Sequence, residues 1–324
     1  LWLLRLVPGG RAGRWWCAVL LLLLLCAFFS ATGALSNPDT WAAAAFFCAI
    51  LAYITPVFHY VTERSEAAFD EVVSHLTLDA ETIERLRSGF SRKSGAWLMV
   101  NTSLGVLTWV LHSRLLAGGF DEMFATISRD PLDFSMAVGP LPVWVFMFCA
   151  IHALVDNARI FRGLTRSVEI DLLDTTILTP FGRMAVASTL VVIGAQALFP
   201  IMWLGTDTNP WTYIPGLFAT GLPLLYLFIA PVWPLHQRLR QLKRLELERL
   251  GADIRARRAS DQGDPERDGA LSTLLVYRRE IADANEWPFD LSIIARFGVY
   301  LIIVPLTWIG AALIENLVDL FISS

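Results

Sequence analysis

The chain has 324 residues, of which 55% are hydrophobic and 17% are charged, and its formal net charge at pH 7 is −4. A typical soluble domain carries about 25% charged residues, and here the apolar residues are gathered in long blocks. This composition excludes an ordinary soluble domain and predicts an all-α, polytopic membrane helix bundle. The lipid bilayer is an expected partner. Nucleic acid is not, because the net charge is negative and no basic stretch is interleaved with aromatic residues.

Seven apolar blocks are long enough to cross a bilayer, for which about 20 residues are needed. The predicted spans cover residues 15–35, 41–60, 95–115, 140–158, 184–204, 212–234 and 293–314. The first block has the basic start and the small-residue end of a signal peptide. Its apolar stretch is longer than a usual signal core, so we expect it to be retained as the first span.

Basic residues are distributed very unevenly between the segments that join these blocks. With a cytoplasmic N-terminus, the inner segments 1–14, 61–94, 159–183 and 235–296 contain 3, 5, 4 and 12 Lys and Arg residues. They hold 24 of the 26 basic residues of the chain. The positive-inside rule therefore predicts a cytoplasmic N-terminus and an outer C-terminus. We expect the protein in a plasma or inner membrane.

The sequence divides into three regions. Residues 1–234 carry six spans with short loops, residues 235–290 form a cytoplasmic helical hairpin, and residues 291–324 carry the seventh span. The cytoplasmic segment 61–94 begins as an amphipathic helix. We expect Asp79 or Thr77 to cap a second, shorter helix, and Gly89 to end that helix.

The segment between the fourth and fifth spans, residues 159–183, is expected to form a short helix or turn at the membrane surface. Its three carboxylates are Glu169, Asp171 and Asp174. A catalytic role for them is an unfavoured alternative, because no nucleophile or metal ligand accompanies them.

The predicted hairpin contains a long amphipathic helix. From residue 235 to residue 258 the chain has no proline and one glycine, and charged residues surround an apolar stripe. A helix of this length extends about 36 Å beyond the sixth span. The stripe is our candidate partner-binding surface, with Leu239, Leu242, Leu245 and Leu250 as its members. It is expected to pack on the other arm, on a second copy in a homo-oligomer, or on a different cytoplasmic protein.

Six polar side chains inside the predicted spans form a candidate path through the membrane: Asn101, Thr108, His112, His152, Asp156 and Gln196. Residues 101, 108 and 112 share one helical face, and residues 152 and 156 are one turn apart. Ionisable groups inside a membrane are costly and mark functional candidates. The alternative is that these side chains only fix the packing through interhelical hydrogen bonds, which are worth about 0.6 kcal/mol each.

The sequence contains no recognisable signature of an enzyme, a metal site or a cofactor. It has no phosphate-binding glycine loop, no His-Glu-x-x-His helix and no Gly-x-Ser-x-Gly elbow. All four cysteines lie in apolar blocks, and no Cys-x-x-Cys pair exists. No span carries two histidines, which excludes a di-haem bundle; one haem between His59 and His152 is disfavoured because their expected depths differ. We therefore expect no metal and no cofactor.

Two functions from different classes remain. The first is an oligomeric channel or transporter for ions or protons, in which the polar side chains form the path and the hairpin serves assembly or gating. The second is a non-enzymatic signalling or scaffold protein whose hairpin docks a cytoplasmic partner. A membrane enzyme is the least favoured of the three classes considered.

Overall fold

The computed structural model describes residues 11–204, 214–259 and 265–287, together with six isolated positions between 295 and 310. Within these residues the regular structure is helical, with one isolated antiparallel bridge between Leu76 and Val168. The predicted all-α class is confirmed for this part of the chain. The α-helices are α2 (Arg11–Ala31), α3 (Trp41–Val72), α4 (Ala80–Ser91), α5 (Gly95–Ala117), α6 (Phe120–Arg129), α7 (Pro131–Val138), α8 (Pro140–Leu164), α9 (Thr179–Gln196), α10 (Ile214–Ala259) and α11 (Pro265–Asp283). Short 3₁₀ turns are η1 (Val73–His75), η2 (Thr175–Leu178) and η3 (Phe199–Leu204).

Five helical segments are long and apolar enough to cross a membrane, and they correspond to the second to sixth predicted spans. They are Trp41–His75, Ala80–Ala117, Pro131–Leu164, Thr175–Met202 and Ile214–Ala259. The first predicted span forms a shorter apolar helix, Trp15–Ala31, within α2. The seventh, at 293–314, falls outside the described ranges.

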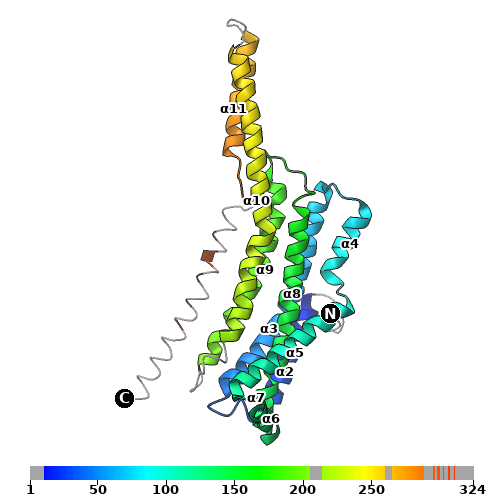
Figure 1. The fold of residues 1–324 in the computed structure, drawn as a ribbon, viewed down its shortest axis with the longest axis vertical. Coiled ribbons are helices and arrows are strands. Elements are labelled where there is room, and N and C mark those ends of the chain that lie inside the picture. The colour runs from blue at the N-terminus through cyan, green and yellow to red at the C-terminus, as the bar shows by residue number, and fades with distance from the viewer. Residues whose placement is uncertain are drawn as a thin grey trace, which may run out of the picture.

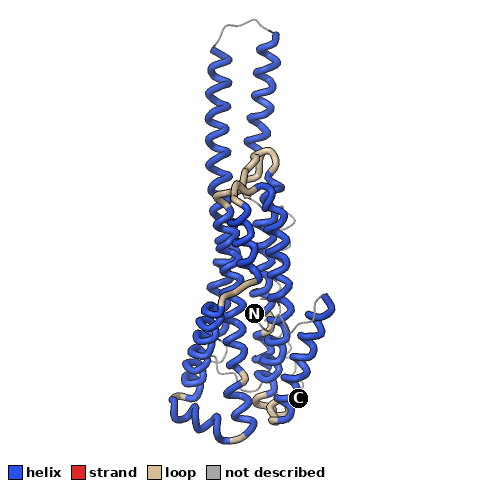
Figure 2. The backbone as a smooth tube through the Cα atoms, turned by 90° about the vertical axis from the view of Figure 1, so that its right-hand side faces the viewer, coloured by secondary structure: helices blue, strands red, loops and turns tan. Residues whose placement is uncertain are grey.

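The helices form an elongated bundle (Figure 1). In it α5 packs on α8, α3 packs on α9 and α2, and α10 packs on both α8 and α9. Helix α10 is continuous over 46 residues, or about 69 Å, although Pro223, Pro231 and Pro234 lie inside it. Its last part runs beside α11 beyond one end of the bundle (Figure 2). We call residues 235–259 and α11 the arms, and the end of the bundle that carries them the arm end.

The apolar stripe predicted to bind a partner is divided between the bundle and the arms. Leu239 is 1% exposed and belongs to the core of the bundle, where it packs with residues of α3, α8 and α9. Leu250 is also buried, Leu242 is half-buried, and Leu245 is exposed. The stripe is therefore not one continuous free surface, because the bundle covers its first turn. The turn between the arms, 260–264, lies outside the described residues.

Two connecting segments differ from their expected structure. Helix α4 continues through Gly89 to Ser91, so the predicted break at Gly89 is wrong. The connection between the third and fourth predicted spans, expected to be a short loop, forms α6 and α7. The segment 159–183, expected to be a short helix or turn, contains a turn at residues 165–167 and the 3₁₀ turn η2.

Phenylalanines hold α4 against the arm end of the bundle. The ring of Phe90 on α4 lies 5.6 Å from Phe69 on α3 and 6.0 Å from Phe161 on α8, measured between centroids. Phe161 in turn meets Phe181 on α9 edge to face at 5.5 Å. All four rings are almost fully buried, and such pairs add to the apolar burial. Helix α4 therefore runs back along the bundle from the arm end and delivers the chain to the start of α5 (Figure 1).

Candidate functional site

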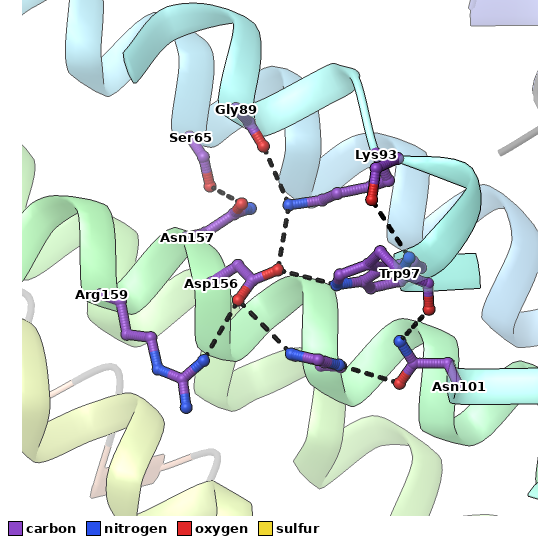
Figure 3. Close-up of polar contacts among 10 residues, drawn as sticks. Ser65, Gly89, Lys93, Trp97, Asn101, Asp156, Asn157 and Arg159 are labelled. Carbon is purple, nitrogen blue, oxygen red and sulfur yellow. Dashed lines mark hydrogen bonds and ion pairs between the residues drawn. The ribbon is translucent and has the colours of Figure 1, made fainter. Parts of the chain in front are cut away.

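The carboxylate of Asp156 on α8 is the centre of a polar network where α4 ends and α5 begins (Figure 3). Its Oδ2 atom accepts hydrogen bonds from Nε1 of Trp97 at 3.0 Å and from Nζ of Lys93 at 3.4 Å. Its Oδ1 atom lies 3.3 Å from the guanidinium of Arg159 and 3.6 Å from Nε2 of His152. The side chain of Asp156 is 23% exposed and that of Lys93 is 9% exposed. The carboxylate thus has three donors and the ring of His152 around it, in a largely buried position.

The start of α5 is built to place two of these donors. Ser94 is the N-cap residue of α5, and its hydroxyl oxygen accepts the backbone N–H of Trp97 at 3.1 Å. This is the usual way in which a serine satisfies the first turn of a helix. Lys93 precedes the cap, and its ammonium group also donates to the carbonyl of Gly89 at 2.9 Å. The link between α4 and α5 therefore fixes the indole and the ammonium on the same side, facing α8.

Asn101 determines which ring nitrogen of His152 carries a proton. The amide nitrogen of Asn101 donates to the carbonyl of Trp97 at 2.8 Å, and a carbonyl oxygen can only accept. The amide oxygen of Asn101 therefore faces Nδ1 of His152, at 2.9 Å, so Nδ1 must donate. In a neutral imidazole the other nitrogen, Nε2, then has no proton to give to Asp156. A second proton, on His152 or on Asp156, is required to complete that contact.

The network holds more positive than negative charge. Lys93 and Arg159 are cations facing one anion, Asp156, before His152 takes up any proton. A protonated His152 therefore competes with both cations for the same carboxylate.

Two other predicted path residues form separate pairs. His112, on the half of α5 away from the arm end, accepts a hydrogen bond at Nδ1 from Nε1 of Trp144 on α8, at 3.2 Å. Gln196 donates from its side-chain amide to the hydroxyl of Thr220 on α10 at 3.2 Å. Thr108 is half-buried on α5. The structure therefore brings Asn101, His152 and Asp156 together and places the others elsewhere.

A close helix contact separates the Asp156 network from His112. Gly105 lies between Asn101 and His112 on the buried face of α5. A Cβ at Gly105 would lie 2.6 Å from the backbone Cα of Val145 on α8. The two backbones thus touch at this level, and no room remains between them for a row of water molecules.

Beyond this contact an open cavity of about 420 Å³ lies at the end of the bundle opposite the arms. Apolar side chains supply most of its wall, including Phe46, Trp144 and Met147. The polar groups in the wall include His112 and Asp133. The volume lies within the usual range for small-molecule pockets, about 300–1,000 Å³.

Lys93 and Trp97 belong to the site but were not among the predicted residues. Lys93 stands in a polar stretch that reads as a helix break, and Trp97 stands where tryptophan often marks the membrane surface. Their shared direction toward Asp156 depends on how α4 folds back, which local sequence does not encode. Within the described ranges, no group of three or more His, Cys, Asp or Glu side chains is arranged to hold a metal ion.

Comparison with known proteins gives no relative from which to transfer a function: no protein-family model, curated protein sequence or solved structure matches this chain.

Proposed function

We propose that this membrane protein moves protons across the bilayer, with His152 and Asp156 as the proton-binding pair near the arm end. The observation that carries the proposal is the orientation of His152. Its Nδ1 proton is committed to Asn101, and its Nε2 atom faces the carboxylate of Asp156 at 3.6 Å. A pair held in this way gains or loses one proton at a defined place. The proposed function is not enzymatic.

The cavity and the Gly105 contact separate this proton site from the solvent at the end of the bundle opposite the arms. The cavity beside His112 supplies an outer vestibule, and the contact of Gly105 with Val145 is a barrier between the vestibule and the network. We propose that exchange of partners at Asp156 loosens the α5–α8 contact and lets the barrier open. The arms then serve assembly of a homo-oligomer or gating, because α10 passes directly from the bundle into them.

Proton flux into proteoliposomes tests the proposal. Purified protein is reconstituted with a pH-sensitive dye inside, and a pH gradient is imposed together with a potassium diffusion potential. We expect a flux that falls at least about tenfold in Asp156→Asn and in His152→Gln, because each removes one member of the proton-binding pair. Asp70→Asn is the matched control, since Asp70 pairs with Arg87 on the surface at 2.9 Å, outside the network. No flux above that of empty liposomes, or an unchanged flux in Asp156→Asn, would disprove the proposal.

A scaffold function is the second candidate, and a specific observation favours it. The arms extend beyond the bundle and expose Leu245 on α10 and Leu275 and Val276 on α11. A cytoplasmic protein partner that covers these side chains would bind with the arms. Replacing all three with glutamine should then abolish co-purification of a stoichiometric partner and leave proton flux unchanged.

A further inference from the structure

We propose that the groove between α3 and α9 binds an acyl chain of an anionic phospholipid, whose headgroup lies against Arg64. The groove has a volume of about 520 Å³ and is separate from the Asp156 network. Its walls are apolar over most of their length and become charged toward the arm end. The residues that line it include Tyr53, Tyr60, Arg64, Glu71, Arg183 and Ala187.

The length of the groove matches one leaflet of a bilayer. Tyr53 and Arg64 both line it and are eleven residues apart on α3, which corresponds to about 16 Å along the helix. Half of the hydrocarbon thickness of a bilayer is about 15 Å. A chain that starts at the level of Arg64 therefore ends near Tyr53, at the middle of the membrane.

Tyr53 closes the inner end of the groove. Its hydroxyl donates to the carbonyl of Val191 on α9 at 3.0 Å, which joins the two helices at this level. A Cβ at Gly194 would lie 2.1 Å from this hydroxyl, so glycine is needed to admit the tyrosine. This bridge between the two helices forms the floor of the groove.

At the charged end of the groove, Arg64 has no carboxylate partner among the residues that the structure describes. Arg183 on α9 is paired with Glu71 on α3. Arg64 is exposed, donates from Nε to the hydroxyl of Tyr60 at 3.2 Å, and lies over that ring. Among the described residues no carboxylate lies within ion-pair distance of Arg64. The net charge of these three ionised side chains is one positive, which a phosphodiester would balance.

The apolar length of the groove and the charge of Arg64 together identify the class of molecule that fits it. A free anion would use the guanidinium of Arg64 but would leave some 16 Å of apolar groove empty. A neutral lipid would fill the groove but would not neutralise the cation. Ala187 on α9 and Ala67 on α3 are small, and their size leaves the width for a hydrocarbon chain. An anionic phospholipid of the leaflet on the arm side satisfies both ends at once.

Native mass spectrometry of the delipidated full chain tests this inference. The probes are phosphatidylglycerol and phosphatidylcholine with identical acyl chains, supplied in equal amounts. We expect phosphatidylglycerol to bind about fivefold more strongly than phosphatidylcholine. One basic residue at a membrane surface contributes this much to the affinity for an anionic lipid. Arg64→Gln should abolish this preference. Arg85→Gln is the matched control, because Arg85 is an exposed arginine of α4 that pairs with Glu81.

A second variant tests the acyl chain. Ala187→Phe fills the groove and should reduce binding of both lipids, whereas Ala96→Phe, on the exposed surface of α5, should not. An unchanged preference in Arg64→Gln, or undiminished lipid binding in Ala187→Phe, would overturn the inference. Displacement of phosphatidylglycerol by millimolar inorganic phosphate would also overturn it, because the site would then recognise a free anion. So would a change of oligomeric state in Ala187→Phe without loss of lipid, since a second copy would then occupy the groove.

Discussion

On α8, Nε2 of His152 lies 3.6 Å from Oδ1 of Asp156, one helical turn away. The other ring nitrogen is held by Asn101 on α5. The same carboxylate is the point at which α8 contacts the link between α4 and α5, through Lys93 and Trp97.

Removing Asp156 should cost more stability than removing Lys93. Asp156→Ala leaves the nearly buried ammonium of Lys93 without its carboxylate, whereas Lys93→Met leaves Asp156 with Trp97 and Arg159 as donors. We expect a loss of about 2–4 kcal/mol for Asp156→Ala and about 1 kcal/mol for Lys93→Met. Thermal unfolding in detergent measures both.

The double variant provides the control for this comparison. Asp156→Ala combined with Lys93→Met should be less destabilised than the sum of the single variants, because neither buried charge remains unpaired. Strictly additive effects would show that Lys93 and Asp156 do not interact in the folded protein.

Gly105→Ala should separate α5 from α8. The added methyl group would meet backbone atoms of Val145, which cannot rotate away, so the helices must move apart. We expect a loss of about 1–3 kcal/mol, in the range for overpacking. Gly163→Ala is the control, since nothing lies within 4 Å of a Cβ at Gly163 inside α8. That variant should be neutral or more stable by up to about 1 kcal/mol. Equal effects of the two substitutions would contradict the close contact.

The cap of α4 should make stability depend on pH below 5. Hydrogen bonds from the backbone and side chain of Thr82 lower the pKa of Asp79 from its ordinary value of 3.8. The folded protein therefore stabilises the ionised form of Asp79. Its contribution to the free energy of unfolding is fully present above pH 3.8 and is lost as the pH falls through the lowered pKa. Asp79→Asn retains a capping side chain that does not titrate. The difference in melting temperature between wild type and Asp79→Asn should be constant above pH 5 and shrink toward pH 3. A difference that stays the same over this interval would refute the assignment.

Features that depend on local sequence could be predicted, and features that depend on folding back of the chain could not. Five predicted spans correspond to helices of sufficient length, because about 20 apolar residues are enough to identify a span. Asp79 or Thr77 was also expected as a cap, and the structure has Asp79, whose carboxylate accepts the N–H of Thr82 at 2.9 Å. By contrast, Gly89 was expected to end α4. Glycine is a poor helix former in isolation, but the packing of Phe90 on Phe69 and Phe161 accompanies one further turn of α4 here.

The same distinction applies to the candidate site, of which three residues could be predicted from the sequence and two could not. The spacing of His152 and Asp156 placed them on one helical face, and Asn101 was among the polar residues of the third span, where the structure buries it. Lys93 and Trp97 reach Asp156 only because α4 packs on Phe161 of α8 and turns the chain back. No property of residues 93–97 alone indicates this contact.

Arg238 connects the base of the arms to the end of α8, and its loss should loosen that junction. Its guanidinium donates to the carbonyls of Thr165 at 2.6 Å and Val168 at 2.9 Å. Carbonyls at a helix C-terminus lack partners within the helix, and a cation there is favourable. Arg238→Gln should therefore destabilise the protein by about 1–3 kcal/mol and speed hydrogen exchange in residues 165–174. Arg240→Gln, two positions further along α10 on an exposed face, should change stability by less than about 0.5 kcal/mol. If both variants had the same exchange pattern, Arg238 would not link the arms to α8, and a gating movement would have to pass through the apolar contacts of Leu235 and Leu239 instead.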